Sequence, residues 1–221
     1  MGAQQVETIY TQYINSQISK EPKVNRSNLG FYYIVKRAID IILCLIGLVI
    51  ALPIMVIVGI AIKLESKGPI IYKQERVGLE GRTFTIYKLR SMYIDAEKNG
   101  AQWACKDDPR VTKVGRFIRK TRIDELPQLI NILKGDMSIV GPRPERPILT
   151  YKFNEEIPGF VNRLQVKPGL TGWAQVTGGY ELSPKEKLEK DMYYIENQSL
   201  WLDLKIIFKT IFVVFNGDGA R

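Results

Sequence analysis

An uninterrupted apolar segment constrains this chain more than any other feature. Residues 41–62 read IILCLIGLVIALPIMVIVGIAI and contain no charged side chain. A helix of this length, at about 1.5 Å per residue, covers the ~30 Å hydrocarbon core of a bilayer. The segment begins far from the N-terminus and ends without a small-residue cleavage site. We therefore predict a membrane segment that is retained, not a cleaved signal peptide.

The residues around this segment favour one of two membrane arrangements. Basic residues flank it on both sides: Lys36 and Arg37 before it, and Lys63, Lys67 and Lys73 after it. Because basic residues prefer the cytoplasmic side, a straight span would export one of these two ends. Pro53, near the middle, removes a backbone donor and can break the helix. We predict a re-entrant helix-break-helix hairpin over residues 31–66, with a single kinked span as the alternative.

Composition restricts the chemistry of the remaining chain. The 221 residues include no histidine, which excludes Ser-His-Asp triads, His-ligated zinc and imidazole acid–base catalysis. The two cysteines, Cys44 and Cys105, are too few for a disulfide framework and indicate a reducing compartment. Catalysis would have to use carboxylates, other polar groups or a hard metal ion.

The rest of the chain reads as a polar extension followed by one larger unit. Residues 1–30 are polar, with a short helix expected around residues 6–18, and residues 67–221 form the predicted catalytic domain. Alternating residues around GLEG predict a β-hairpin over residues 70–87, and a helix is expected over residues 90–98. Residues 199–215 favour an interfacial helix. We predict an α+β fold: a mostly helical membrane-associated domain with a re-entrant hairpin, a small β-hairpin and interfacial amphipathic helices.

A basic stripe precedes two adjacent acids. Its members are Arg110, Lys113, Arg116, Arg119, Lys120 and Arg122. Such a stripe suits either anionic lipid head groups or a phosphate-rich substrate, and both readings stay open here. Asp124 and Glu125 follow at once. In a chain without histidine, carboxylates are the natural nucleophile or base for phosphoryl transfer, and they can hold Mg²⁺.

Other motifs narrow the choice of ligand. Arg143, between Pro142 and Pro144, has a stiff backbone that suits a preorganised phosphate contact. GxxxxGK[ST] and GxGxxG loops are absent from the sequence. The formal net charge of +9 fits nucleic acid, but the aromatic residues gather near the apolar segments and not in the basic stripe. We therefore predict no nucleic-acid partner.

Five separated segments resemble the bacterial sugar transferases, the monotopic phosphoglycosyl transferases. They are the membrane segment that continues into GPIIYKQERVG, then YKLRSM, RKTRIDELPQLINILKGDMSIVGPRPE, LQVKPGLTGWAQV and YYIENQSLWLDLKII. The resemblance covers about residues 33–215. The sequence resembles the minimal catalytic form of the family, since the four-helix membrane bundle that precedes this unit in larger members is not seen before residue 33.

This resemblance implies a function and roles for individual residues. The family transfers a sugar-1-phosphate from a UDP-sugar to undecaprenyl phosphate, releasing UMP, through a covalent aspartyl-phosphosugar intermediate. It begins capsule, exopolysaccharide or glycoconjugate synthesis at the cytosolic face of the bacterial cytoplasmic membrane. Asp124 is the expected nucleophile, and Glu125 its partner in holding Mg²⁺. Motif positions assign substrate binding to Lys88, Arg90, Arg119, Arg143 and Lys167.

The sequence leaves open the details of the helix break, the donor sugar, the oligomeric state and the role of residues 1–30. Pro53 matches the family's break, although Leu52 stands where many members have serine. A non-catalytic adaptor that binds anionic lipid through the basic stripe is the alternative function. The sequence does not decide which UDP-sugar is used, whether the protein forms a homo-oligomer, or what residues 1–30 bind.

Overall fold

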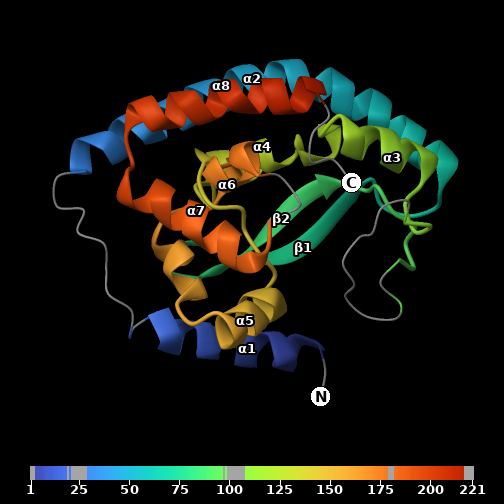
Figure 1. The fold of residues 1–221 in the computed structure, drawn as a ribbon. Coiled ribbons are helices and arrows are strands. Elements are labelled where there is room, and N and C mark those ends of the chain that lie inside the picture. The colour runs from blue at the N-terminus through green and yellow to red at the C-terminus, as the bar shows by residue number, and fades with distance from the viewer. Residues whose placement is uncertain are drawn as a thin grey trace.

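The computed structural model describes residues 3–18, 20, 29–96, 98, 108–178 and 182–216, so Cys105 lies outside the described residues. Within these ranges the chain is mostly helical (Figure 1). The helices are α1 (Ala3–Ile18), α2 (Gly30–Glu65), α3 (Lys113–Lys120), α4 (Gln128–Lys134), α5 (Pro147–Glu156), α6 (Trp173–Thr177), α7 (Pro184–Glu196) and α8 (Leu200–Asn216). The 3-10 turns are η1 (Leu79–Gly81), η2 (Ile123–Glu125) and η3 (Phe160–Gln165).

The strands form two small sheets. Strands β1 (Ile71–Val77) and β2 (Thr83–Leu89) pair antiparallel from Ile71↔Leu89 to Val77↔Thr83, which confirms the expected β-hairpin. Strands β3 (Ser138–Val140) and β4 (Gly169–Thr171) pair in parallel. The turn between β1 and β2 places Gly81 at φ 78, a left-handed conformation that glycine adopts without strain.

The helix expected over residues 90–98 is wrong. Within residues 90–96 the chain stays extended and then turns, and Met92 forms a β-bridge with Val111. The Tyr93 N–H donates to the Arg110 carbonyl, and the Thr112 N–H donates to the Ser91 carbonyl. Pairing with a distant segment therefore satisfies backbone groups that a local helix would otherwise have used.

The apolar segment forms most of α2, which is one helix of 36 residues. Helix continues through Pro53, so the expected break into two separate helices is not seen. The proline removes one backbone hydrogen bond, and a helix can accommodate that loss by bending. In Figure 1, α2 arches over α4 and the β1–β2 hairpin.

Polar contacts tie both ends of α2 to the rest of the protein. Near its N-terminus, Lys36 Nζ and the Tyr32 hydroxyl donate to Asp203 of α8, at 2.8 and 2.9 Å. At its C-terminus, the Glu65 carboxylate accepts from the N–H groups of Lys113 and Val114, which begin α3, at 2.6 and 3.0 Å. Both ends of the apolar helix are therefore tied to elements that follow it in the chain, α8 and α3.

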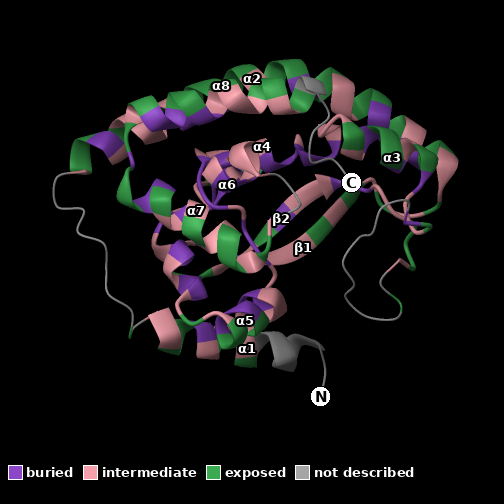
Figure 2. Ribbon diagram, viewed as in Figure 1, coloured by how far each residue is buried: buried purple, intermediate pink, exposed green. Residues whose placement is uncertain are grey.

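Much of the outer face of α2 is apolar and exposed. Val49, Ile50 and Ile57 are 74%, 63% and 68% exposed, and α8 beside it exposes Trp201 and Phe212. Figure 2 shows these exposed stretches along α2 and α8, on the side facing away from the hairpin. Within the described residues, α2 is the one helix long and apolar enough to cross a membrane, judged by length and composition.

Helix α1 belongs to the packed structure. The expected short helix near the N-terminus is confirmed, and Ile14 is fully buried against Val77, Val161 and Leu164. The helix lies against α5, on the side of the molecule opposite α2 (Figure 1). The division into residues 1–30, 31–66 and 67–221 stays a prediction.

Candidate active site

Asp124 and Glu125 lie in the short turn η2, between α3 and α4. Thr112 caps α3, since its side chain accepts from the Gly115 N–H, and α3 ends at Lys120. Arg122 then adopts a left-handed conformation (φ 59, ψ 12) that is costly for a residue with a side chain. This reversal turns both acids inward, and each is only 7% exposed.

Glu125 is held by two basic residues from distant parts of the chain. Lys88 Nζ of β2 lies 3.0 Å from Glu125 Oε1, and the Arg143 guanidinium donates to both carboxylate oxygens. Burial opposes ionisation of Glu125, but the charges of Arg143 and Lys88 outweigh it and hold the pKa of this carboxyl well below its usual range. Glu125 is therefore a fixed negative charge, already neutralised by its neighbours.

The pKa of Asp124 is shifted in the opposite direction to that of Glu125. Burial raises the pKa of this carboxyl to about 6, and the negative charge of Glu125 adds to that effect, while Lys88, Arg143 and Arg119 oppose it. Within the described part of the chain, the Asp124 carboxylate makes no hydrogen bond or salt bridge. Two neighbouring carboxyls with pKa values moved apart are a common arrangement in catalytic sites.

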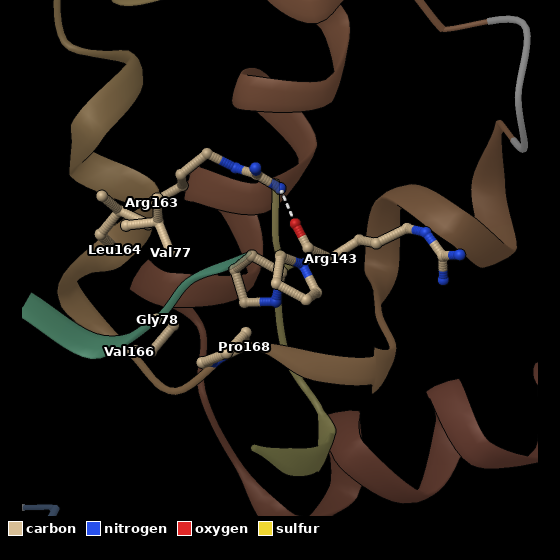
Figure 3. A pocket seen from close by; sticks show the side chains of 9 residues that line it. Val77, Gly78, Arg143, Arg163, Leu164, Val166 and Pro168 are labelled. Carbon is tan, nitrogen blue, oxygen red and sulfur yellow. Dashed lines mark hydrogen bonds between the residues drawn. The ribbon is translucent and has the colours of Figure 1, made fainter. Parts of the chain in front are cut away.

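Buried residues fix the backbone that carries Arg143. Arg163 of η3 donates to the Arg143 carbonyl at 2.8 Å, and its guanidinium also donates twice to Asp191 of α7, at 2.9 and 2.6 Å. Arg163 and Asp191 are 2% and 1% exposed. Figure 3 shows Arg163 reaching the Arg143 carbonyl, while the Arg143 side chain extends away from the other labelled residues. This arrangement positions the guanidinium that binds Glu125.

Sequence reasoning missed Arg163 and Asp191. They lie 28 positions apart, and each also occurs in an ordinary polar context, so no local signal links them to Arg143. Only the packing of η3 against α7 brings the two side chains together. Their importance was therefore invisible until the fold was known.

The other predicted substrate-binding residues lie in three different places. Arg119 is near Asp124 and donates from Nε to the Ser91 hydroxyl at 2.8 Å. The Arg90 guanidinium is bonded to the carbonyls of Ser66 and Lys67, just after α2. Its role as a substrate contact stays a prediction, since two of its nitrogens already have protein partners.

Lys167 lies at the other end of α4 from Asp124. Burial lowers the pKa of this ammonium, and the charge of Arg37 lowers it further. Arg37 in turn donates to the carbonyls of Ile132 and Leu133, in the last turn of α4. A role for Lys167 in substrate binding also stays a prediction.

Asp124 and Glu125 are the residues that could hold a metal ion. Among the described residues, no group of three or more acidic or sulfur ligands is close enough to form a metal cage. Magnesium is commonly bound by one or two carboxylates, with substrate phosphates and water completing its shell. The uncommitted carboxylate of Asp124 fits that requirement, and Glu125 Oε2, which accepts one hydrogen bond from Arg143, keeps a lone pair for the ion.

Comparison with protein families decides the classification. A family model described as bacterial sugar transferase matches residues 31–217, which is most of the chain. The chain belongs to this family. The match includes α2, the hairpin and the Asp124–Glu125 site, so the resemblance seen in the sequence is confirmed.

Three relatives show which named proteins the chain is similar to. The chain is 50% identical over 193 residues (86% of this chain, 46% of the relative) to the UDP-N-acetylgalactosamine-undecaprenyl-phosphate N-acetylgalactosaminephosphotransferase of Aeromonas hydrophila. It is 44% identical over 196 residues (86% and 42%) to the UDP-glucose:undecaprenyl-phosphate glucose-1-phosphate transferase of Escherichia coli (strain K12). A Caulobacter vibrioides protein of the latter name is 41% identical over 190 residues (84% and 71%). The chain thus spans less than half the length of the first two relatives.

Proposed function

We propose that this protein transfers a sugar-1-phosphate from a UDP-sugar to undecaprenyl phosphate, with release of UMP. The observation that carries the proposal is the pair of buried carboxyls in η2. Asp124, with its pKa raised to about 6, is ionised at neutral pH and has no protein partner within the described residues. Glu125, Lys88 and Arg143 surround it with fixed charges of both signs.

The reaction would proceed in two displacement steps. A carboxylate oxygen of Asp124 attacks the phosphorus that carries the sugar, the bridging P–O bond of the diphosphate breaks, and UMP leaves with that electron pair. A phosphate oxygen of undecaprenyl phosphate then attacks the same phosphorus and displaces Asp124. A covalent intermediate suits these substrates, because a water-soluble donor and a lipid acceptor can then use one site in turn.

Basic residues would stabilise the charge on the transferred group. Arg119 and Arg143 are close enough to Asp124 for their positive charges to lower its pKa. A guanidinium group can donate two parallel hydrogen bonds to phosphate oxygens. Asp124 and Glu125 would hold Mg²⁺, which supplies further neutralisation of diphosphate charge. The positive charge of Lys88 lowers the pKa of Glu125, so Glu125 stays ionised and keeps its negative charge beside Asp124.

We further propose a monotopic placement on the cytosolic face of the bacterial membrane. The contacts of Lys36 with Asp203 and of Glu65 with the start of α3 support it, because both ends of α2 bind the same domain. The exposed apolar residues of α2 and α8 would enter the lipid, and the exposed Lys113, Arg116 and Lys120 of α3 would meet anionic head groups.

The test combines two measurements on the purified protein in mild detergent. UMP release is measured with UDP-N-acetylgalactosamine, UDP-glucose and UDP-galactose, with and without undecaprenyl phosphate. Intact-mass analysis after incubation with the donor alone should detect a phosphosugar adduct, and Asp124→Asn should abolish it. The exposed-turn variant Asp95→Asn is the matched control and should form the adduct normally. Product formation by Asp124→Asn would reject Asp124 as the nucleophile.

A further inference from the structure

A groove lies between the hairpin, α4 and the end of α2, with a volume of about 550 Å³. Ile71 and Lys73 of β1 lie two residues apart, and Tyr87 is the cross-strand partner of Lys73, so all three are on one face of the hairpin. Pro127 and Ile130 lie three residues apart and form the opposite wall. Two elements that are remote in sequence therefore line one open groove.

The lining of the groove combines an apolar wall with basic residues. Its apolar members also include Pro69 and Ile70, while its charged members are Lys63, Lys73 and Lys134, all exposed. No described residue that lines the groove is acidic. In the described ranges, Lys63 and Lys73 make no salt bridge. The groove is therefore complementary to an anionic molecule with a large apolar part.

The groove adjoins both the candidate active site and the apolar surface of α2. Pro127 precedes α4 directly and lies three residues after Asp124. Tyr87 lines the groove from β2, whereas the side chain of the next residue, Lys88, lies on the other face of the strand, with its ammonium 3.0 Å from Glu125. On its other side the groove is lined by Lys63 of α2, the helix that exposes its apolar face.

We propose that this groove binds the isoprenoid chain of the phosphorylated lipid acceptor, in the part of the chain next to the phosphate. A nucleotide-sugar is polar throughout and gains little from a wall of proline and isoleucine, whereas an isoprenoid buries apolar area there. The lysines offer the attraction that the acceptor's phosphate requires. This inference rests on the proposed function, and it adds the place where the second substrate binds.

The two half-reactions separate acceptor binding from catalysis. Ile130 is 40% exposed, so Ile130→Trp fills the groove without disturbing the interior. Adduct formation from the UDP-sugar alone should be unchanged, while transfer from the preformed adduct to undecaprenyl phosphate should slow about ten-fold, equivalent to losing one well-buried apolar contact. Ile9→Trp, at a 48% exposed position on α1, is the control and should leave both steps unchanged. Equal effects of Ile130→Trp on both half-reactions, or on neither, would overturn the proposal.

A binding experiment tests the groove independently of turnover. Farnesyl phosphate carrying a photoreactive group on its chain is cross-linked to the full-length protein in detergent, and the labelled peptides are mapped. Label should fall on residues 69–73 and 127–134, and Ile130→Trp should reduce it. Label confined to α8, or equal competition by inorganic phosphate and by farnesyl phosphate, would overturn the proposal. If the wild-type protein forms no adduct yet labels the groove, the proposed reaction fails and the groove assignment stands.

Discussion

Replacing the proposed nucleophile should make the protein more stable. Asp124 is buried beside Glu125, and its pKa in the folded protein is raised from 3.8 to about 6. The native structure therefore disfavours the charged form of this carboxyl relative to the unfolded chain. Asp124→Asn keeps the shape of the side chain and removes that charge. We expect the variant to be inactive and more resistant to unfolding at neutral pH.

The size and pH dependence of this effect follow from the pKa shift. A rise of about two units corresponds to roughly 3 kcal/mol of destabilisation in the wild-type protein. Well below pH 3.8 the carboxyl is protonated in both folded and unfolded chains, so the cost is absent, and near pH 4 it is still small. It grows as pH rises, because the unfolded chain loses its proton first, and it is complete above about pH 6. The stability gained by the variant should follow the same course.

The measurement is urea unfolding in mild detergent, followed by tryptophan fluorescence, at about pH 4 and about pH 7.5. Asp124→Asn should exceed the wild type by a few kcal/mol at the higher pH and by little at the lower one. Asp95→Asn changes an exposed carboxyl and should stay within about 0.5 kcal/mol of the wild type at both. A variant that is equally or less stable at neutral pH, or a gain that does not depend on pH, would refute the reasoning.

Three further predictions concern the reaction and the membrane helix. Because Asp124 would attack in its ionised form, the rate of adduct formation should rise with pH and reach half its maximum near pH 6; a flat profile between about pH 5 and 7 would contradict this. Asp191→Asn should remove the carboxylate that accepts two hydrogen bonds from Arg163 and leave Glu145 as its remaining acidic neighbour. We expect it to lower the unfolding free energy by about 3 kcal/mol and to slow adduct formation through Arg143; a normal rate would show that this pair does not position the site. Pro53→Ala should favour a straighter α2. The measurement is the labelling of single cysteines placed at the two ends of α2, which should differ between the variant and the wild type. The same labelling in both proteins would contradict a bend at this proline.

Local sequence signals predicted several elements correctly. The alternation around GLEG predicted the hairpin, which the β1–β2 register confirms. A serine followed three residues later by a glutamate is a local signal of a helix start, and Ser183 and Glu186 form such a capping box at the start of α7. Each of these signals lies within a few residues of the structure it specifies, so no long-range contact had to be known.

Signals that depend on distant partners were less informative. The segment after β2 was expected to be helical, but it pairs with residues 110–112 and stays extended until its turn. The apolar pattern and its basic flanks predicted a hairpin broken at Pro53, but a proline is compatible with either a break or a bend, and no local signal distinguishes the two. The structure forms a continuous helix whose ends are fixed by Asp203 and by α3.

The sequence by itself determined that this chain has one long apolar helix, no histidine chemistry and two adjacent carboxyls after a basic stripe. Those are properties of composition and of short-range spacing. Only the tertiary structure decided that the two carboxyls differ, since Lys88 and Arg143 reach Glu125 from positions 37 and 18 residues away. Burial, which raises the pKa of Asp124, likewise exists only after α3, α4 and the hairpin have packed together, because desolvation depends on everything that surrounds a side chain.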